Sequence, residues 1–215
     1  MDAIVSAKRP KAGRPSRAQA EARLAELLDA ALDHFLEKGF EQARIDDIAF
    51  SVNMTKRTIY SRFPDKVSLF RAAVRRAIEK LAIAPERIRV VRAQTLEQTL
   101  AALAWLRVDR IMTPEGLKLQ RIINTESYRF PDIFTTSYEL GVLPVINFLA
   151  ELLVEENQAG RLAVEDPHLA ANMFVSMAIS APVRIFVSGN YLPREEIDRR
   201  IRFAIRLFLD GARRR

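Results

Sequence analysis

A cluster of basic and hydroxyl side chains occupies one stretch of the chain at the spacing of an exposed helix face. Lys56 and Arg57 can donate hydrogen bonds to guanine O6 and N7 in the major groove, and Thr58 and Ser61 offer hydroxyls to base edges. Residues 53–76 hold seven Lys or Arg and one acidic residue, which favours a polyanion as the partner. These residue types predict that Lys56, Arg57, Thr58 and Ser61 contact DNA bases. A lone charged helix face is more often simply solvated, so the surrounding elements must decide.

The residues around this cluster predict two short helices joined by a tight turn. Ile48 and Val52 lie on one face of a first helix. Asn53 can adopt the left-handed backbone that a sharp turn needs, and Thr55 can cap the start of the next helix. Ile59 then points inward, which leaves the polar side chains facing outward. The context therefore favours DNA contact over a solvated helix face.

This segment resembles the DNA-binding domain of the TetR family of bacterial transcriptional regulators. The family pattern of Ile-Ala, a turn glycine, a capping Ser or Thr, Leu-Tyr, an aromatic residue and Lys has counterparts throughout Ile48–Lys66. The match continues upstream through Leu24 and the Gly39-Phe40 pair, and downstream to Leu69, so it covers about fifty residues. The resemblance implies an N-terminal three-helix domain, with phosphate contacts from Thr55, Tyr60, Arg62 and Lys66.

Two positions depart from the family pattern. Asn53 stands where the family usually has Gly, and the turn should survive because Asn is tolerated in the left-handed region. Ala43 and Arg44 stand where the family usually has Thr residues that cap the second helix and touch phosphate. A side-chain cap is worth about 1 kcal/mol, and Arg44 cannot accept from a backbone N–H. We expect Arg44 to reach a phosphate itself.

Composition predicts an almost wholly helical protein. The 215 residues include only seven Gly and ten Pro, with Ala, Leu, Arg and Glu abundant. The net charge of +7 is concentrated at the N-terminal side, since residues 1–80 carry 16 basic and 11 acidic residues. We expect an all-α, TetR-like fold of about nine helices. The expected organisation is a basic disordered arm (1–20), a helix-turn-helix domain (21–82) and an effector-binding and dimerisation domain (83–215).

No pattern in the chain indicates catalysis or a bound metal. Cysteine is absent, which excludes disulfides, cysteine-type zinc sites and thiol catalysis. His34 and His168 are far apart in sequence, and we interpret both as structural. No nucleophile with a base, phosphate-binding glycine loop or paired carboxylates has a recognisable spacing. We therefore expect no catalytic residues, no metal and no cofactor.

The N-terminal arm is basic and has no apolar run of the kind found in signal peptides. Within it, Gly13-Arg14-Pro15 could insert Arg14 into an A·T-rich minor groove, although a basic tail is by default solvated. The longest uncharged run, Pro167–Val183, is interrupted by Pro182 and is slightly short for a membrane span. We expect a cytoplasmic protein that does not contact a membrane.

The C-terminal part contains the signals of several longer helices. The expected helices are Thr95–Met112, Thr113–Arg129, a short one over Asp132–Tyr138, Pro144–Ala159, Asp166–Val187 with a kink at Pro182, and a last one from Pro193. The segment Arg121–Pro131, with Gly160-Arg-Leu and Asp166 further on, resembles the AefR-like subclass of TetR C-terminal domains.

Aromatic, methionine and polar residues of this domain are candidates for an effector pocket, and ordinary core is the alternative for each. The predicted pocket residues are Trp105, Met112, Arg121, Asn124, Tyr128, Phe148 and Met177, and Phe134, Tyr138 and Met173 are further aromatic or methionine candidates. The last helix is apolar on more than one side, which indicates a partner. The predicted dimer interface is Met173, Ile185, Ile201, Ile205 and Phe208.

Together these patterns predict a homodimeric, ligand-responsive regulator, and we expect a repressor. Two reading helices fit successive major grooves of an inverted-repeat operator at a separation of about 34 Å. A small organic effector that binds better to a splayed dimer would release the DNA. The alternative is a small cytosolic enzyme or a carrier of lipid or another apolar ligand. Salt-dependent binding to duplex DNA distinguishes the two, since a carrier or enzyme does not need it.

Overall fold

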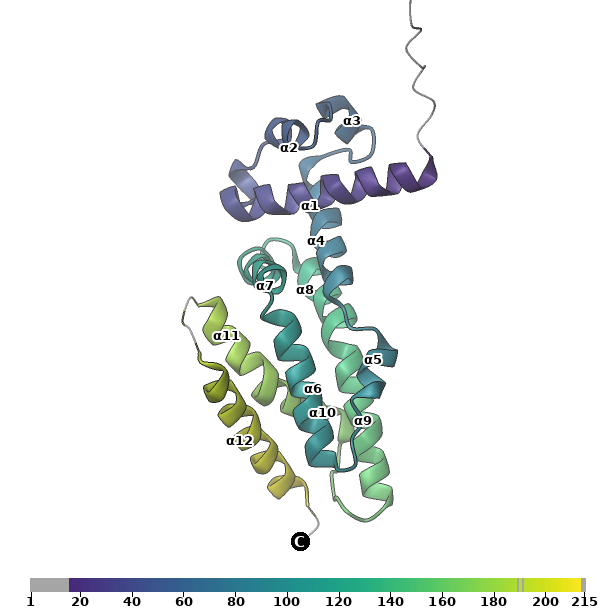
Figure 1. Ribbon diagram of the computed structural model, residues 1–215, viewed down its shortest axis with the longest axis vertical. Helices are drawn as coiled ribbons and strands as arrows, with labels where there is room; N and C mark the ends of the chain where they lie inside the picture. Colours follow the sequence, from purple (N-terminus) through teal and green to yellow (C-terminus); the bar gives the residue numbers. More distant parts are fainter. Residues whose placement is uncertain (1–15, 189, 191, 214–215) are drawn as a thin grey trace, which may run out of the picture.

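The computed structural model describes residues 16–188, 190 and 192–213, which form helices joined by short connections. The elements are α1 Arg17–Gln42, α2 Ile45–Ser51, α3 Lys56–Tyr60, α4 Lys66–Leu81, α5 Pro85–Val90, α6 Leu96–Ile111, α7 Pro114–Glu126, α8 Pro131–Ser137, the π-helical η1 Tyr138–Val142, α9 Leu143–Gln158, α10 Pro167–Val175, the π-helical η2 Ser176–Ser180, α11 Ala181–Val187 and α12 Arg194–Ala212. Helices α1 to α3 form one end of the molecule, and α4 descends from them into a bundle of longer helices (Figure 1). The predicted all-α class is confirmed.

Helix α1 begins earlier than the predicted end of the N-terminal arm. Ser16 caps it, with its hydroxyl accepting a hydrogen bond from the N–H of Gln19. Residues 17–20, which we assigned to the arm, are therefore helical. The helix is interrupted at Gly39, whose φ of 75° would be strained for a residue with a side chain. This break turns Phe40 into the core between α1 and α4.

Side-chain caps start the longer helices where the sequence predicts them. Asp65 accepts from the N–H of Ser68 at 2.7 Å, and Thr95 accepts from that of Gln98 at 3.2 Å. Thr113 and Asp166 cap α7 and α10 in the same way. Each cap satisfies a backbone donor that the helix itself cannot pair. Helix α5, which begins at Pro85, is a short additional helix that we did not predict.

One predicted helix boundary lies inside a continuous helix. The expected break between Tyr138 and Pro144 is wrong, because η1 joins α8 to α9 without interruption. Likewise η2 joins α10 to α11, so the expected distortion of this helix is a π turn immediately before Pro182. A π turn absorbs an extra residue without ending the helix. With these segments joined, the number of helices in the described part is close to the predicted nine.

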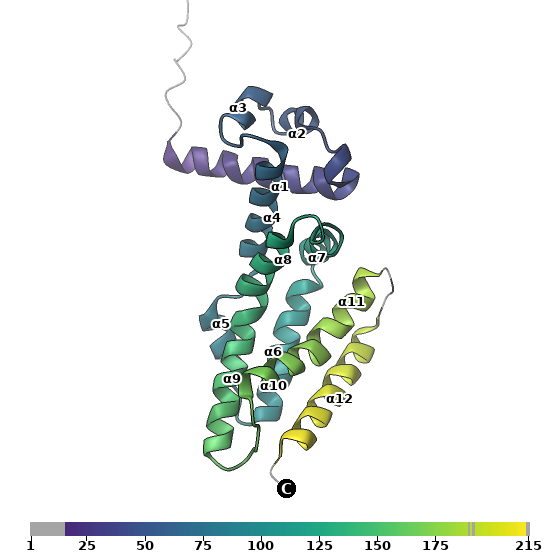
Figure 2. The same cartoon turned by 180° about the vertical axis from the view of Figure 1, so that it is seen from behind.

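The buried side chains form two cores, and α7 and α8 belong to the N-terminal one. Leu119 and Ile122 of α7 pack with the apolar residues of α1 to α4. Phe130, between α7 and α8, lies with its ring centroid 5.0 Å from that of Phe40 and 5.1 Å from that of Phe70. Segments that follow residue 82 in the chain therefore complete the core of the first three helices. Figure 2 shows α7 and α8 directly below α1 from the opposite side.

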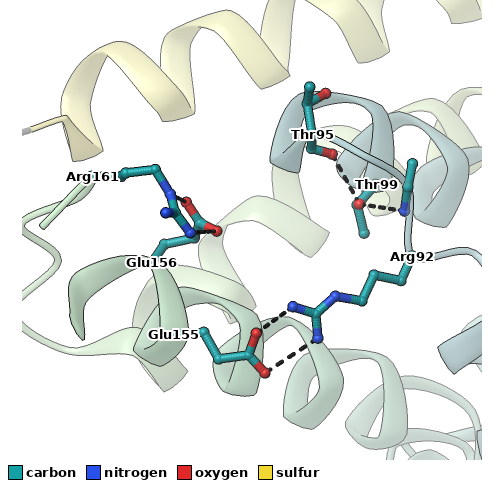
Figure 3. A network of polar contacts seen from close by, with 7 residues as sticks. Arg92, Thr95, Thr99, Glu155, Glu156 and Arg161 are labelled. Atoms are coloured by element: carbon teal, nitrogen blue, oxygen red, sulfur yellow. Dashed lines mark hydrogen bonds and ion pairs between the residues drawn. The ribbon is translucent and has the colours of Figure 1, made fainter. Parts of the chain in front are cut away.

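The C-terminal core lies between α6, α9, α10, α11 and α12, with α12 on its outer flank (Figures 1 and 2). At the end of α9, Arg92 binds the carboxylate of Glu155 through both terminal guanidinium nitrogens (Figure 3). The buried hydroxyl of Thr99 donates to the carbonyl of Thr95 at 3.0 Å, beside this ion pair (Figure 3). Two described stretches, Pro131–Gln158 and Pro167–Phe186, have the length and composition of membrane spans, but both supply buried residues to the cores.

Candidate functional site

A tight turn between α2 and α3 sets the direction of α3. Asn53 has a φ of 51°, the only positive φ of a residue other than glycine in the described part of the chain. Thr55 accepts a hydrogen bond from the N–H of Thr58 at 3.1 Å and caps α3. Val52 and Ile59 are buried, with 2% and 1% of their surfaces exposed, so both helices are anchored from below. The predicted turn, cap and inward-facing residues are confirmed.

The opposite face of α3 is exposed to solvent and carries the predicted DNA-contact residues, namely Thr55, Lys56, Arg57, Thr58, Tyr60, Ser61 and Arg62. Arg57 and Arg62 have no ion pair or hydrogen bond through their guanidinium groups to any described residue, so both are available to a ligand. Lys56 pairs with Asp46 of α2 at 3.0 Å, an exposed contact that DNA could replace. The face therefore combines free cations with hydroxyl groups, as binding to base edges and phosphates requires.

Lys66 has a different environment from the one we predicted. Its ammonium group donates to the carbonyl oxygens of Glu41 at 2.9 Å and Ala43 at 3.2 Å. It also lies 4.7 Å from the centroid of the Phe40 ring. These contacts satisfy carbonyls at the end of α1 and hold the start of α4 against it. We therefore reassign Lys66 from a phosphate contact to a structural contact.

Arg44 precedes α2 and is exposed. No side chain caps the N-terminus of α2, as the replacement of the family Thr by Arg predicts. The Arg44 guanidinium forms no ion pair or hydrogen bond with any described residue. Arg14, the predicted minor-groove contact, lies outside the described residues.

The turn makes a testable prediction about stability. A side chain without a local hydrogen-bonding group costs about 1 kcal/mol in the left-handed region. Asn53→Ala should therefore lower the free energy of unfolding by about 1 kcal/mol, whereas Asn53→Gly should change it by less than half as much. Urea denaturation of the two variants measures the difference. Equal destabilisation by Ala and Gly would show that the backbone conformation at this position is not what matters.

A cavity of about 380 Å³ lies in the C-terminal domain, within the size range of small-molecule sites. Its walls come from α6, α7, α8, η1, α9, α10, η2 and α11. Both π-helical segments contribute, with Tyr138 and Val142 from η1 and Ser176 and Ile179 from η2. Such segments are frequent at functional sites because they redirect side chains within a helix. The cavity is therefore the best candidate for an effector site.

Of the seven predicted pocket residues, only Asn124 lines this cavity, together with the further candidates Phe134 and Tyr138. Trp105 faces α12 instead, where its Nε1 donates to Asp198 at 3.2 Å. The guanidinium of Arg194 lies 4.0 Å above the same indole ring. These contacts explain why Trp105 is part of a helix–helix interface rather than a cavity.

The other predicted pocket residues also lie outside this cavity. Phe148 is buried in the C-terminal core, and Met112 packs against the same core at the end of α6. Arg121 is exposed, and Tyr128 is 99% exposed. Met177 lies on the exposed surface between η2 and α12. Their residue types are common to cores and pockets, so composition could not separate the two.

Arg107 of α6 is a cavity residue that the sequence analysis missed. Only 8% of its surface is exposed, and no described residue forms an ion pair or hydrogen bond with its guanidinium. Burial, together with the nearby charge of Arg110, lowers the pKa of Arg107 to about 10, so it stays charged at neutral pH. The sequence contained a signal, because Arg107 follows Leu100, Leu103 and Ala104 at the spacing of one buried helix face.

The predicted dimer residues lie on two different faces. Ile201 and Ile205 of α12 are fully buried within the chain, so their assignment to a dimer interface is wrong. Phe208 packs on Phe174, with 5.3 Å between ring centroids, and Ile185 is half-buried. Of the predicted set, only Met173 belongs to the exposed apolar surface of α10 to α12. That surface comprises Leu169, Met173, Met177, Phe203 and Leu207 and includes a groove between η2, α11 and α12.

Comparisons with known proteins agree with this arrangement. Residues 27–73 match the family model described as bacterial regulatory proteins of the tetR family. Residues 98–211, more than half of the chain, match the C-terminal domain of AefR-like transcriptional repressors. These two ranges contain α3 with its turn and the cavity, respectively.

Individual relatives are also regulators. AcuR, a transcriptional regulator of Cereibacter sphaeroides, is 29% identical over 77% of this chain and 78% of its own length. The activator FasR of Mycolicibacterium smegmatis is 33% identical, but the match spans only 34% of this chain and 35% of FasR.

Solved structures extend the likeness to nearly the whole chain. A TetR-family regulator from Mesorhizobium loti is 25% identical, with a TM-score of 0.74, and covers 93% of this chain and 100% of its own. The flavonoid-responsive regulator FrrA is 30% identical, with a TM-score of 0.71, and covers 91% of this chain and 99% of its own. The chain therefore belongs to the TetR family of bacterial transcriptional regulators.

Proposed function

We propose that the protein is a cytoplasmic, dimeric repressor that binds an inverted-repeat operator through α3 and is released by a small organic effector. The observation that carries this proposal is the exposed, basic and hydroxyl-rich face of α3, held by a left-handed turn and a side-chain cap. Relatives include both activators and negative regulators, such as FasR and the biofilm operon regulator IcaR of Staphylococcus aureus. Repression is our proposal because the C-terminal match is to a domain of repressors.

The proposed DNA contacts follow from the position of each side chain. Lys56, Arg57, Thr58 and Ser61 occupy the outer face of α3 and its C-terminal cap, and we assign them to base edges. The proposed phosphate contacts are Arg44, Thr55, Tyr60 and Arg62. Base edges specify sequence, whereas phosphate contacts fix the position and orientation of the protein. No catalytic role is proposed.

Helix α7 offers a physical route from the cavity to the DNA-binding helices. Gln120, Ile123 and Asn124 line the cavity, while Leu119 and Ile122 are buried in the N-terminal core. Ile123 belongs to both sets. A ligand that moves α7 must therefore move packing that also supports α1 and α4 (Figure 1).

Polar contacts reinforce this connection. Lys118 of α7 pairs with Asp33 of α1 at 2.9 Å, and Arg71 of α4 pairs with Asp132 of α8 at 2.9 Å. Arg110, one turn after the cavity residue Arg107, donates to backbone carbonyls at the end of α4. These links join α6, α7 and α8 to the helices that carry α3. We propose that effector binding changes the separation of the two α3 helices in the dimer through these contacts.

The proposed division of roles on α3 predicts two different mutant phenotypes. Arg57→Ala should weaken binding to the preferred operator by about 1 to 3 kcal/mol and relax base preference, since a bidentate arginine discriminates between bases. Arg62→Ala should weaken all sequences to a similar extent and reduce the salt slope by about one unit. Fluorescence anisotropy with the selected operator, single-base variants and a scrambled duplex over a salt series measures both effects.

The same titration tests the function itself. Wild-type protein should bind a selected inverted repeat far more tightly than the scrambled duplex, with an affinity that falls steeply as salt rises. Indistinguishable, weak binding to both duplexes would favour the enzyme or carrier interpretation. An equal loss of base preference in Arg57→Ala and Arg62→Ala would keep the function but contradict the assignment of contacts.

A further inference from the structure

Arg107 is a buried residue of the cavity wall whose guanidinium has no partner of opposite charge in the described part of the chain. An uncompensated charge in a protein interior is costly, and buried arginines are usually paired with carboxylates. Only 8% of the surface of Arg107 is exposed, and no described residue accepts a hydrogen bond from its guanidinium or forms an ion pair with it. A bound anion would supply the missing partner.

The composition of the cavity wall has the same implication. None of the described lining residues is an Asp or a Glu, and the lining includes a second arginine, the exposed Arg184. The remaining polar groups are neutral, among them Gln120, Asn124 and Tyr138. The Nδ2 group of Asn172 lies 3.5 Å from the hydroxyl of Tyr138, which places a donor and an acceptor together on one wall. The site thus combines two positively charged side chains with neutral hydrogen-bonding groups.

Apolar side chains form the rest of the wall. Val175, Ile179 and Val183 come from the α10–η2–α11 helix, and Val145 from α9. A ligand that fills the cavity must therefore have an apolar body as well as a charged group. Inorganic ions alone would leave this surface without a partner.

We propose that the cavity binds a small organic acid whose carboxylate pairs with Arg107 and whose apolar body lies against η2 and α11. This inference rests on the proposed function, in which the cavity is the effector site. A planar guanidinium can hold a carboxylate through two parallel hydrogen bonds, and such charge-assisted pairs are strongest where water is excluded. The buried end of the cavity has a single uncompensated cation, so one negative charge neutralises it. A phosphate monoester, which carries about −1.5 to −2 at neutral pH, would leave an excess of buried negative charge.

The test compares acids with neutral analogues of the same shape. The probes are benzoate, cinnamate and octanoate, each paired with its primary amide, and phenyl phosphate as the dianionic comparison. Calorimetry and thermal shift are measured on the full-length wild-type protein and on Arg107→Gln, Arg107→Lys and Arg121→Gln. At least one acid should bind wild type better than its amide.

Arg107→Gln should weaken the binding of that acid about 10- to 100-fold while changing amide binding less than about threefold. Arg107→Lys should lose less, and Arg121→Gln, which removes an exposed cation outside the cavity, should lose less than about threefold.

Gly141 of η1 provides a second test that does not remove Arg107. A Cβ atom at Gly141 would lie 3.8 Å from Nη2 of Arg107, an ordinary van der Waals distance, so a short side chain can be accommodated there. Gly141→Asp places a carboxylate beside the guanidinium, whereas Gly141→Asn adds the same volume without charge. Gly141→Asp should weaken the preferred acid at least about tenfold more than Gly141→Asn, because the internal carboxylate already neutralises Arg107.

The outcomes separate this inference from the proposed function. Acids that bind no better than their amides, phosphate that binds better than every acid, or Arg107→Gln and Arg121→Gln variants with equal losses would each overturn it. Operator affinity is measured in parallel with and without the preferred acid. If the acid binds through Arg107 but leaves operator affinity unchanged, the site is correct and the proposed release mechanism is wrong. If operator binding is absent altogether, the proposed function fails while the acid site stands.

Discussion

Phe203→Glu and Leu207→Glu should each convert the protein into monomers and reduce operator binding by more than about a hundredfold. The side chains of Phe203 and Leu207 are 59% and 56% exposed, one helical turn apart on α12. A dimer contact would bury them, and a glutamate at either position would then place an unpaired charge between the subunits. Loss of the dimer also removes the second half-site, and with it the large gain from binding two linked sites at once. Sedimentation velocity and anisotropy on the operator measure the two effects.

The buried face of the same helix provides the matched control. Ile205→Ala should lower the free energy of unfolding by about 2 to 5 kcal/mol, because it creates a cavity in the core, but the folded protein should remain a dimer. The two faces of α12 thereby separate assembly from stability. If the Phe203→Glu protein still sediments as a dimer, the assignment of this surface to the dimer interface is wrong.

The assignment of Ile201 and Ile205 to the interface shows where sequence patterns are insufficient. Both faces of α12 are apolar, and spacing identifies which residues share a face without saying which face meets the chain's own core. Only the packing of α12 on α6 and α10 resolves that choice. The sequence correctly indicated that α12 is apolar on more than one side, and the exposed Phe203 and Leu207 form its second apolar face.

Local features of the fold were predictable because their causes are local. The turn at Asn53 and the cap at Thr55 depend on residues within three or four positions, and both were predicted from the sequence. Lys66 shows the limit of this approach. Its carbonyl partners lie 23 and 25 residues earlier in the chain, and only the crossing of α1 and α4 brings them together.

The cavity was harder to predict because pockets and cores use the same residue types. Phe148 and Trp105 pack between helices and do not line the cavity. Arg107, the cavity residue with the most distinctive chemistry, lies within an apolar stretch of the sequence. A charged residue at a buried position of a helix is a stronger indicator of a ligand site than an aromatic one, since its burial requires a partner. The helix periodicity around Arg107 was sufficient to reveal this.

The second large effect concerns Phe130, which joins the C-terminal domain to the DNA-binding helices. Its ring packs on Phe40 and Phe70, and it lies between α7, which lines the cavity, and α8. Phe130→Ala should lower the free energy of unfolding by about 3 to 5 kcal/mol. The same change should leave effector affinity within about threefold of wild type, because Phe130 does not line the cavity.

Coupling, rather than binding, is what Phe130→Ala should remove. If an effector lowers operator affinity tenfold in wild type, linkage requires that operator lower effector affinity tenfold, a coupling of about 1.4 kcal/mol. Phe35→Ala is the matched control, since Phe35 packs on Phe40 and Phe70 but not on Phe130. Phe35→Ala should lower the free energy of unfolding by a similar amount and keep the coupling.

Calorimetry of the effector with and without operator measures the coupling in both variants, and Phe130→Leu replaces Phe130→Ala if the latter does not fold. Coupling that survives in the Phe130 variants, or that is lost equally in Phe35→Ala, would mean that the signal does not pass through the contact between α8 and the aromatic cluster.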